Sequence, residues 1–209
     1  MTPAEVSTAT DAGAVVVDRR PPRPFATEHL PGAINIQFNR ADLAERMEMV
    51  LPKELRLILH SEPEAIARTA AEILDEAGFL VLGTVEGGLK GWRAAGRETA
   101  SLAVLDVDQL AVALAEYQVI DAREGFEYRH GHIAGARLLP SMEAWSAVDQ
   151  LPSDARYAVV CGDQVRSALV AAVLSRRGLD ATLVMGGMVD WTERGYPLER
   201  GAVTIAPNS

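Results

Sequence analysis

The sequence predicts an α/β protein made of two repeats of one unit, each a mostly parallel sheet with helices on both faces. Three observations lead to this prediction: apolar runs of strand length alternate with segments of helical periodicity, glycine-containing turns join them, and the whole pattern recurs after about 100 residues. Alternating strands and helices are typical of parallel sheets, because consecutive parallel strands need a crossover that is usually a helix.

The elements of the second half can be predicted in chain order. Strand-like apolar runs alternate with amphipathic segments, and glycines follow several of the predicted helices as C-caps. The predicted elements are a helix over 107–116, strands over 118–121, 137–139, 157–160 and 181–185, and helices over 166–177 and 187–194. The first half follows the same pattern, with a strand over 55–59 and a helix over 63–77.

An internal duplication is visible in the order of the motif residues. Aspartate, histidine, glycine and tryptophan positions of the first half recur in the same order in the second half. The matching pairs are Val15–Arg20 with Gln118–Arg123, His29–Ala33 with His132–Ala136, and Gly87–Trp92 with Gly186–Trp191. We therefore predict two homologous domains, residues 1–98 and 103–209, joined around residues 98–101.

The composition is that of an ordinary globular protein and disfavours several classes of function. Hydrophobic residues make up 48% and charged residues 23% of the 209 residues. A net charge of -9 opposes binding to nucleic acid or to anionic lipid. The longest apolar run, Ala168 to Leu174, is too short for a membrane helix, and no basic residue precedes Arg19 as a secretory signal would require. We expect a cytoplasmic protein with no nucleic-acid and no membrane partner.

Residues that occur in both halves are expected to build the fold. Asp18 and Asp121 each end a predicted strand, where a carboxylate can accept N–H groups of the following turn. His29 and His132 each precede a glycine turn, where an imidazole can bridge two loops. Features found in only one half are the better candidates for function.

Cys161 is such a feature and is the only cysteine, which excludes an internal disulfide and a multi-cysteine metal site. It follows an apolar strand and opens the run Cys161–Ser167, which leads into a helix. In that geometry successive backbone N–H groups and the helix N-terminus converge on one point and favour a thiolate. The other interpretation is a buried, inert cysteine, but Gly162 and Arg166 beside it favour a reactive one.

Several motifs together resemble the tandem rhodanese-domain sulfurtransferases. The resemblance rests on the segments Asp121–Arg123, Tyr128–Ala136, Cys161–Ser167, Gly186–Trp191 and Gly195–Leu198. It covers nearly all of the second half and, apart from the loop after the strand, most of the first. The fold it implies is two rhodanese-like α/β domains.

The resemblance implies that Cys161 takes a sulfane sulfur from a donor, forms a persulfide and passes the sulfur to a nucleophilic acceptor. The catalytic residues are then Cys161 as nucleophile and Arg166 as electrostatic stabiliser. The backbone amides of the loop form an anion cradle, while Asp121 and Arg123 orient its surroundings. The expected substrate-binding residues are Gly162, Asp163, Gln164, Val165, Ser167 and Arg123. No metal and no organic cofactor is implied, and the partners are a small-molecule or protein-bound sulfur donor and acceptor.

The first half differs at the corresponding loop. Ser61 replaces Cys161, Ile66 replaces Arg166, and the loop carries the carboxylates of Glu62 and Glu64. Because a hydroxyl group cannot form a persulfide, we expect the first domain to be inactive.

At two positions the loop differs from the family members that use thiosulfate, and these differences leave the identity of the sulfur donor open. Members of the family that use thiosulfate resemble one another in having a cation two residues after the cysteine, where this chain has Asp163, and a glycine often follows where this chain has Gln164. A carboxylate about 4 Å from an incoming charge changes its energy by roughly 1 to 4 kcal/mol. Thiosulfate, a thiol-bound persulfide and a protein donor all remain candidates.

Two other functions share features with this pattern. Phosphatases that share the fold resemble C-x5-R, whereas Cys161 to Arg166 is C-x4-R, the shorter loop of sulfur chemistry. A non-catalytic rhodanese-like module that binds a partner or senses sulfur is the main alternative, and Asp163 is the residue that favours it. The sequence gives no indication of oligomeric state.

Overall fold

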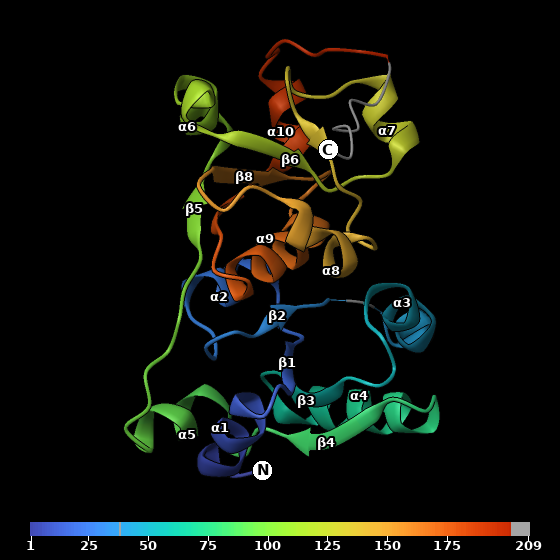
Figure 1. Cartoon of the computed structure of the whole chain (residues 1–209), viewed down its shortest axis with the longest axis vertical. Helices are drawn as coiled ribbons and strands as arrows, with labels where there is room; N and C mark the ends of the chain where they lie inside the picture. The colour runs from blue at the N-terminus through green and yellow to red at the C-terminus, as the bar shows by residue number, and fades with distance from the viewer. Residues whose placement is uncertain (38, 202–209) are drawn as a thin grey trace. The chain divides into compact units, whose positions relative to one another are not determined.

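The chain forms two compact units, Met1–Ser101 and Leu102–Ser209, each of which contains its own sheet. The computed structural model describes residues 1–37 and 39–201. Both sheets are parallel and flanked by helices, as the sequence predicts (Figure 1).

The first unit has a four-stranded sheet in the order β2-β1-β3-β4. Each parallel pair is joined by a crossover that contains a helix, α2 between β1 and β2 and α4 between β3 and β4. The elements are α1 (Pro3–Asp11), β1 (Val15–Asp18), α2 (Pro22–Thr27), β2 (Ile34–Asn35), the 3-10 turn η1 (Arg40–Asp42), α3 (Leu43–Val50), β3 (Arg56–His60), α4 (Glu64–Glu76), β4 (Leu80–Thr84) and α5 (Gly88–Ala94).

The second unit has a five-stranded sheet in the order β5-β9-β8-β6-β7. The catalytic candidate Cys161 lies directly after β8, the central strand. The elements are β5 (Ala103–Leu105), α6 (Val107–Val112), η2 (Leu114–Glu116), β6 (Gln118–Asp121), α7 (Gly125–His130), β7 (Arg137–Leu138), α8 (Ala144–Ala147), η3 (Val148–Gln150), β8 (Arg156–Val160), α9 (Val165–Arg176), β9 (Asp180–Val184) and α10 (Gly187–Glu193).

Most predicted elements are confirmed to within a residue at their ends. The exception is the predicted helix over 107–116, which is divided into α6 and the 3-10 turn η2. Asp106 caps α6 through a reciprocal pair of hydrogen bonds with Gln109, and the helix ends at Val112. The edge strand β5 and the short helices α7 and α8 were not predicted, because runs of three to six residues carry little periodicity.

The two faces of the second sheet carry different helices (Figure 1). On one face, Val119, Val160 and Val184 pack with buried residues of α6, α7 and α10, including Trp191. Helix α9 packs on β8 and β9 and is buried continuously from Ser167 through Leu174. An apolar helix that is covered on nearly all sides fixes the position of the loop that precedes it.

An aspartate–arginine pair lies at the carboxyl end of a central strand in each unit. Asp121 is fully buried and accepts hydrogen bonds from Arg123, at 2.9 Å from Nε to Oδ1 and 2.6 Å from Nη2 to Oδ2. Arg123 also donates to the carbonyl of Gly131 at 2.7 Å. Asp18 and Arg20 repeat this arrangement. The pairs connect the strand end to the next turn, which confirms the structural role predicted for the shared aspartates.

The shared histidines also bind backbone. His132 Nδ1 lies 2.8 Å from the carbonyl oxygen of Tyr128, and the imidazole stacks on the Tyr128 ring at 3.6 Å between centroids. His29 makes the equivalent contacts with Phe25. Each histidine stabilises the end of a short helix before a glycine turn.

None of the helices in residues 1–37 and 39–201 combines the length and apolar composition needed to span a membrane bilayer.

Candidate active site

The loop that contains Cys161 is fixed by the backbone of the Gly186–Gly187 turn. The amide of Met188 donates to the carbonyl of Cys161 at 2.7 Å, and the amide of Val189 donates to the carbonyl of Gly162 at 3.1 Å. Gly187 has a φ of +57°, and a Cβ atom there would overlap the carbonyl oxygen of Cys161. Only glycine allows α10 to begin this close to the loop.

The sulfur of Cys161 lies inside the loop and is surrounded by polar groups. The thiol donates to Ser167 Oγ at 3.3 Å, and the amide of Gln164 donates to Sγ at 3.2 Å. Cys161 as a whole is fully buried. Both contacts suit a sulfur that carries negative charge, because the amide already donates and the hydroxyl of Ser167 can reverse its hydrogen bond.

Gln164 adopts a backbone conformation that glycine normally occupies. Its φ is +132°, and among the described residues it is the only one other than glycine with a positive φ. This conformation turns its amide toward the sulfur and lets its side-chain Oε1 accept a hydrogen bond from the amide of Gly186 at 3.3 Å. The loop is therefore strained at the residue that contacts Sγ.

Asp163 places a carboxylate within the cradle itself. Its Oδ1 accepts the amide of Val165 at 3.1 Å, the first residue of α9, and lies 3.8 Å from Sγ. An amide that would otherwise face an external anion is thus occupied by a carboxylate of the chain. Of the loop amides expected to form the cradle, that of Gln164 faces the sulfur and that of Val165 faces Asp163.

Arg166 is directed toward Glu127 on α7. Its Nη1 and Nη2 lie 2.5 and 2.9 Å from the two carboxylate oxygens, a bidentate pair that is partly buried. The hydrogen bond from Arg166 holds the pKa of Glu127 below its ordinary value, and Glu127 in turn raises the pKa of Arg166. The pair is ionised on both sides at neutral pH, so most of the Arg166 charge is compensated.

Glu127 was missed in the sequence analysis. It lies 39 residues before Arg166, and no motif joins the two positions. The duplication was the available signal. In the first unit, Pro24 occupies the position that matches Glu127, and Ile66 occupies the position that matches Arg166. Both charges therefore occur in one unit only, and occurrence in one unit only is also the reason that Cys161 is a candidate for function.

The structure brings some of the expected site residues together and places one apart. Asp163, Gln164 and Ser167 surround Sγ. Gly162 leaves room for the Arg166 guanidinium, because a Cβ atom on Gly162 would lie 3.4 Å from Arg166 Nη2. Arg123 makes its hydrogen bonds to Asp121 and to Gly131. Its positive charge still helps to lower the pKa of Glu127, so it affects the loop indirectly.

The corresponding position of the first unit has different chemistry. Ser61 is buried and, within the described residues, its hydroxyl has no hydrogen-bond partner. His60 precedes it, where the second unit has Val160, and burial lowers the pKa of this histidine. Glu64 caps the neighbouring turn through the amide of Gly87 at 2.8 Å. No thiol is present here to form a persulfide.

In the described part of the chain, no group of three or more histidine, cysteine, aspartate or glutamate side chains is arranged as metal ligands would be.

Comparison with known families gives two matches along the chain. The sequence profile of the Rhodanese-like domain matches residues 2–95 and residues 106–194. A curated relative, the uncharacterized protein YqhL of Bacillus subtilis, is 28% identical over 88 residues, which cover 42% of this chain and 70% of that protein.

Solved structures similar to this chain carry related descriptions. A rhodanese-related protein from Thermoplasma volcanium is 34% identical over 47% of this chain and 99% of its own, with a TM-score of 0.46. A Rhodanese-like domain protein from Staphylococcus aureus is 32% identical over 48% and 100% of the two chains, with a TM-score of 0.44. A thiosulfate sulfurtransferase from Pseudomonas aeruginosa is 23% identical, with a TM-score of 0.43, over 97% of this chain and 44% of that one.

Replacing Gly187 by alanine should destabilise the second unit more than Gly88→Ala destabilises the first. Both glycines have a positive φ, so both variants lose about 1 kcal/mol from backbone strain. At Gly88 the nearest atom is His60 Cε1 at 3.2 Å, a side chain, whereas at Gly187 it is the Cys161 carbonyl. We therefore expect a total loss of about 3 kcal/mol for Gly187→Ala in urea denaturation. Equal losses for the two variants would contradict the close contact.

The strain at Gln164 should be relieved by glycine but not by alanine. Both variants lose the hydrogen bond from Gly186 to the Gln164 side chain, so we expect Gln164→Gly to be about 1 kcal/mol more stable than Gln164→Ala, because glycine adopts positive φ freely. Gln164→Ala keeps the strain and loses the hydrogen bond to Gly186, so it should lower stability. Thermal denaturation of the three proteins tests this, and a Gln164→Gly variant no more stable than Gln164→Ala would refute it.

Proposed function

This chain belongs to the Rhodanese-like domain family, and we propose that it is a sulfurtransferase in which Cys161 carries the sulfur as a persulfide. The observation that carries the proposal is the loop Cys161–Ser167, in which a backbone amide and a hydroxyl contact a single buried sulfur. The sulfur accepts the Gln164 amide and contacts the Ser167 hydroxyl at the start of a twelve-residue helix. This environment stabilises negative charge, first on the thiolate and then on a persulfide.

The reaction proceeds in two steps. In the first, the Cys161 thiolate attacks the outer sulfur of the donor, a new S–S bond forms, and the donor's own bond to that sulfur breaks with the electron pair leaving on the donor. In the second, a nucleophilic acceptor attacks the outer sulfur of the Cys161 persulfide and releases the thiolate. Two half-reactions through a covalent intermediate give ping-pong kinetics.

The charges around the loop favour a donor with little negative charge. Asp163 lies 3.8 Å from Sγ and occupies the Val165 amide, while Glu127 neutralises Arg166. A dianion such as thiosulfate therefore meets a carboxylate and a compensated cation. The persulfide group of a thiol carries at most one negative charge, and we propose thiol-bound persulfides, small or attached to a protein, as the donor class. The acceptor is a small or protein-bound thiol or another nucleophile.

The burial of Cys161 sets a condition on the reaction. Sγ is enclosed by the loop, so a donor reaches it only if side chains of the loop move aside. The strained Gln164 and the partly exposed Asp163 form the part of the loop that contacts Sγ and are suited to such a movement. We propose that the first unit, with Ser61 in place of the cysteine, has no catalytic role, and that the protein acts in the cytoplasm.

A non-catalytic module that binds or senses sulfur is the second candidate function. The observation that favours it is again Asp163, because a carboxylate in the cradle also disfavours release of sulfur to an anionic acceptor. A sensor would gain the sulfur and retain it, whereas an enzyme passes it on with multiple turnovers.

Cys161→Ser should abolish sulfur transfer. With a glutathione persulfide donor and cyanide as acceptor, we expect the unmodified protein to form thiocyanate catalytically and to gain the mass of one sulfur, roughly 32 Da, with donor alone. The Cys161→Ser variant should do neither, and Ser146→Ala, a serine on α8, serves as the control. A mass gain without turnover would indicate the sensor, and no mass gain at all would refute both functions.

Asp163→Asn should raise the use of thiosulfate selectively. The amide side chain preserves the hydrogen bond from Val165 and removes the negative charge beside Sγ. From the Coulomb energy of a charge at about 4 Å, we expect kcat/KM for thiosulfate to rise tenfold or more, and that for cysteamine persulfide, whose ammonium offsets the persulfide charge, to change little. Asp154→Asn, an exposed position of the same unit, changes the net charge equally and should have no such effect. An unchanged donor ratio in Asp163→Asn would contradict the proposed preference.

A further inference from the structure

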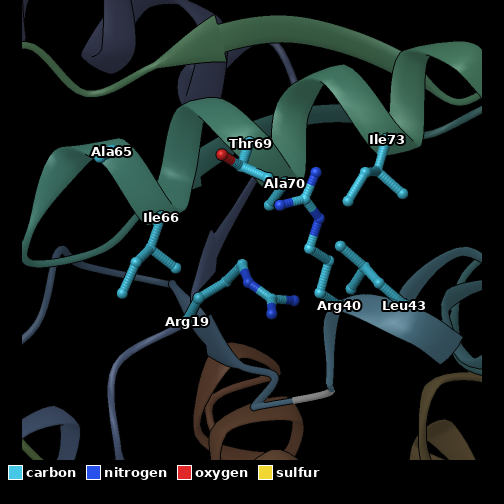
Figure 2. Close-up of a pocket in the computed structure, with 8 residues that line it drawn as sticks. All are labelled: Arg19, Arg40, Leu43, Ala65, Ile66, Thr69, Ala70 and Ile73. Carbon is cyan, nitrogen blue, oxygen red and sulfur yellow. The ribbon is translucent and has the colours of Figure 1, made fainter.

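The first unit contains a pocket of about 300 Å³ that the proposed sulfur chemistry does not use. It lies between α4 on one side and residues after β1 and before α3 on the other (Figure 2). A concave site of this size is suited to a small organic molecule.

One wall of the pocket is apolar. Ile66, Ala70 and Ile73 recur at helical spacing and present one face of α4, and Leu43 faces them from the start of α3 (Figure 2). Ile66 is 45% exposed although it is a large apolar residue. An exposed apolar face inside a concave site indicates that apolar surface of a ligand can be buried there.

Two arginines from different segments extend into the same pocket. Arg19 follows β1 and Arg40 begins η1, and both guanidinium groups point into the space below α4 (Figure 2). Burial lowers the pKa of Arg19, and the nearby carboxylate of Asp42 offsets this only in part. Asp42 is itself hydrogen-bonded to Arg46 at 2.7 Å. Two converging cations in a partly desolvated site are stabilised by an anion.

The second unit lacks these features at the matching positions. Ala122 matches Arg19, and Arg166, which is paired with Glu127, matches Ile66. Val173, the counterpart of Ile73, is fully buried, whereas Ile73 is partly exposed. The pocket is therefore a property of the first unit. There the arginine lies after β1, opposite the helix, whereas in the second unit it lies on the helix itself.

We propose that this pocket binds a small organic anion whose carboxylate or sulfonate head lies between Arg19 and Arg40 and whose apolar chain lies along α4. The two guanidinium groups bind the head by charge-assisted hydrogen bonds, and Thr69 adds a hydroxyl on the same wall. The apolar chain covers Ile66, Ala70 and Ile73. The unit that has no cysteine thereby acquires a role as a ligand-binding domain.

Octanoate titrated into the full chain tests the proposal, with octan-1-ol and octylammonium as probes of equal chain length. Isothermal titration calorimetry should show one site per chain for octanoate and at least tenfold weaker binding of the alcohol and the amine. Arg40→Gln, an exposed substitution, and Ile66→Glu, which brings a carboxylate into the apolar wall, should each weaken octanoate binding at least tenfold. Arg68→Gln on the same helix, outside the pocket, is the matched control and should bind as the unmodified protein does.

Three results would overturn the proposal. They are the absence of octanoate binding at millimolar concentration, equal binding of octanoate and octan-1-ol, and unchanged affinity in both Arg40→Gln and Ile66→Glu. Because Cys161 takes no part in the pocket, Cys161→Ser should bind octanoate normally. The ligand site and the sulfurtransferase activity can therefore succeed or fail independently.

Discussion

The close approach of the Gly187 backbone to the Cys161 carbonyl is the constraint on which the candidate active site depends. It lets α10 begin against the loop, so that the amides of Met188 and Val189 bind the carbonyls of Cys161 and Gly162. With those carbonyls directed outward, the amide of Gln164 can face inward to the sulfur. The buried helix α9 then fixes the other end of the loop. The nucleophile is thus positioned by backbone contacts from two strand ends of the same sheet.

The two units show how one scaffold supports different distributions of charge. Both retain the aspartate–arginine pair, the stacked histidine and the tight glycine turn, which connect the strands to their crossovers. The second unit adds the thiol and the Arg166–Glu127 pair at the loop. The first unit instead has two arginines opposite an apolar helix face. Structural pairs at strand ends leave the loops free to differ, because the sheet does not depend on loop chemistry.

Sequence patterns were sufficient for the parallel sheets, the duplication and the position of Cys161 directly after a strand, because these depend on local periodicity and on motif order. They were insufficient for Glu127, whose partner Arg166 is brought to it only by the tertiary structure, 39 residues further along the chain. The positive φ of Gln164 was equally hidden, since the residue type argues against that conformation. The first-unit pocket could not be predicted, because Arg19, Arg40 and Ile66 come from three segments that tertiary structure alone brings together.

The buried histidines of the first unit make its stability depend on acidity. Burial lowers the pKa of both His60 and His29, so the folded unit holds them neutral while the unfolded chain can take up protons. Their contribution is complete above the ordinary histidine value of about 6.5 and declines as the pH falls below it. Val160 replaces His60 in the second unit and carries no such linkage. Mild acidification therefore weakens the first unit through His60, a position that has no titratable counterpart in the second unit.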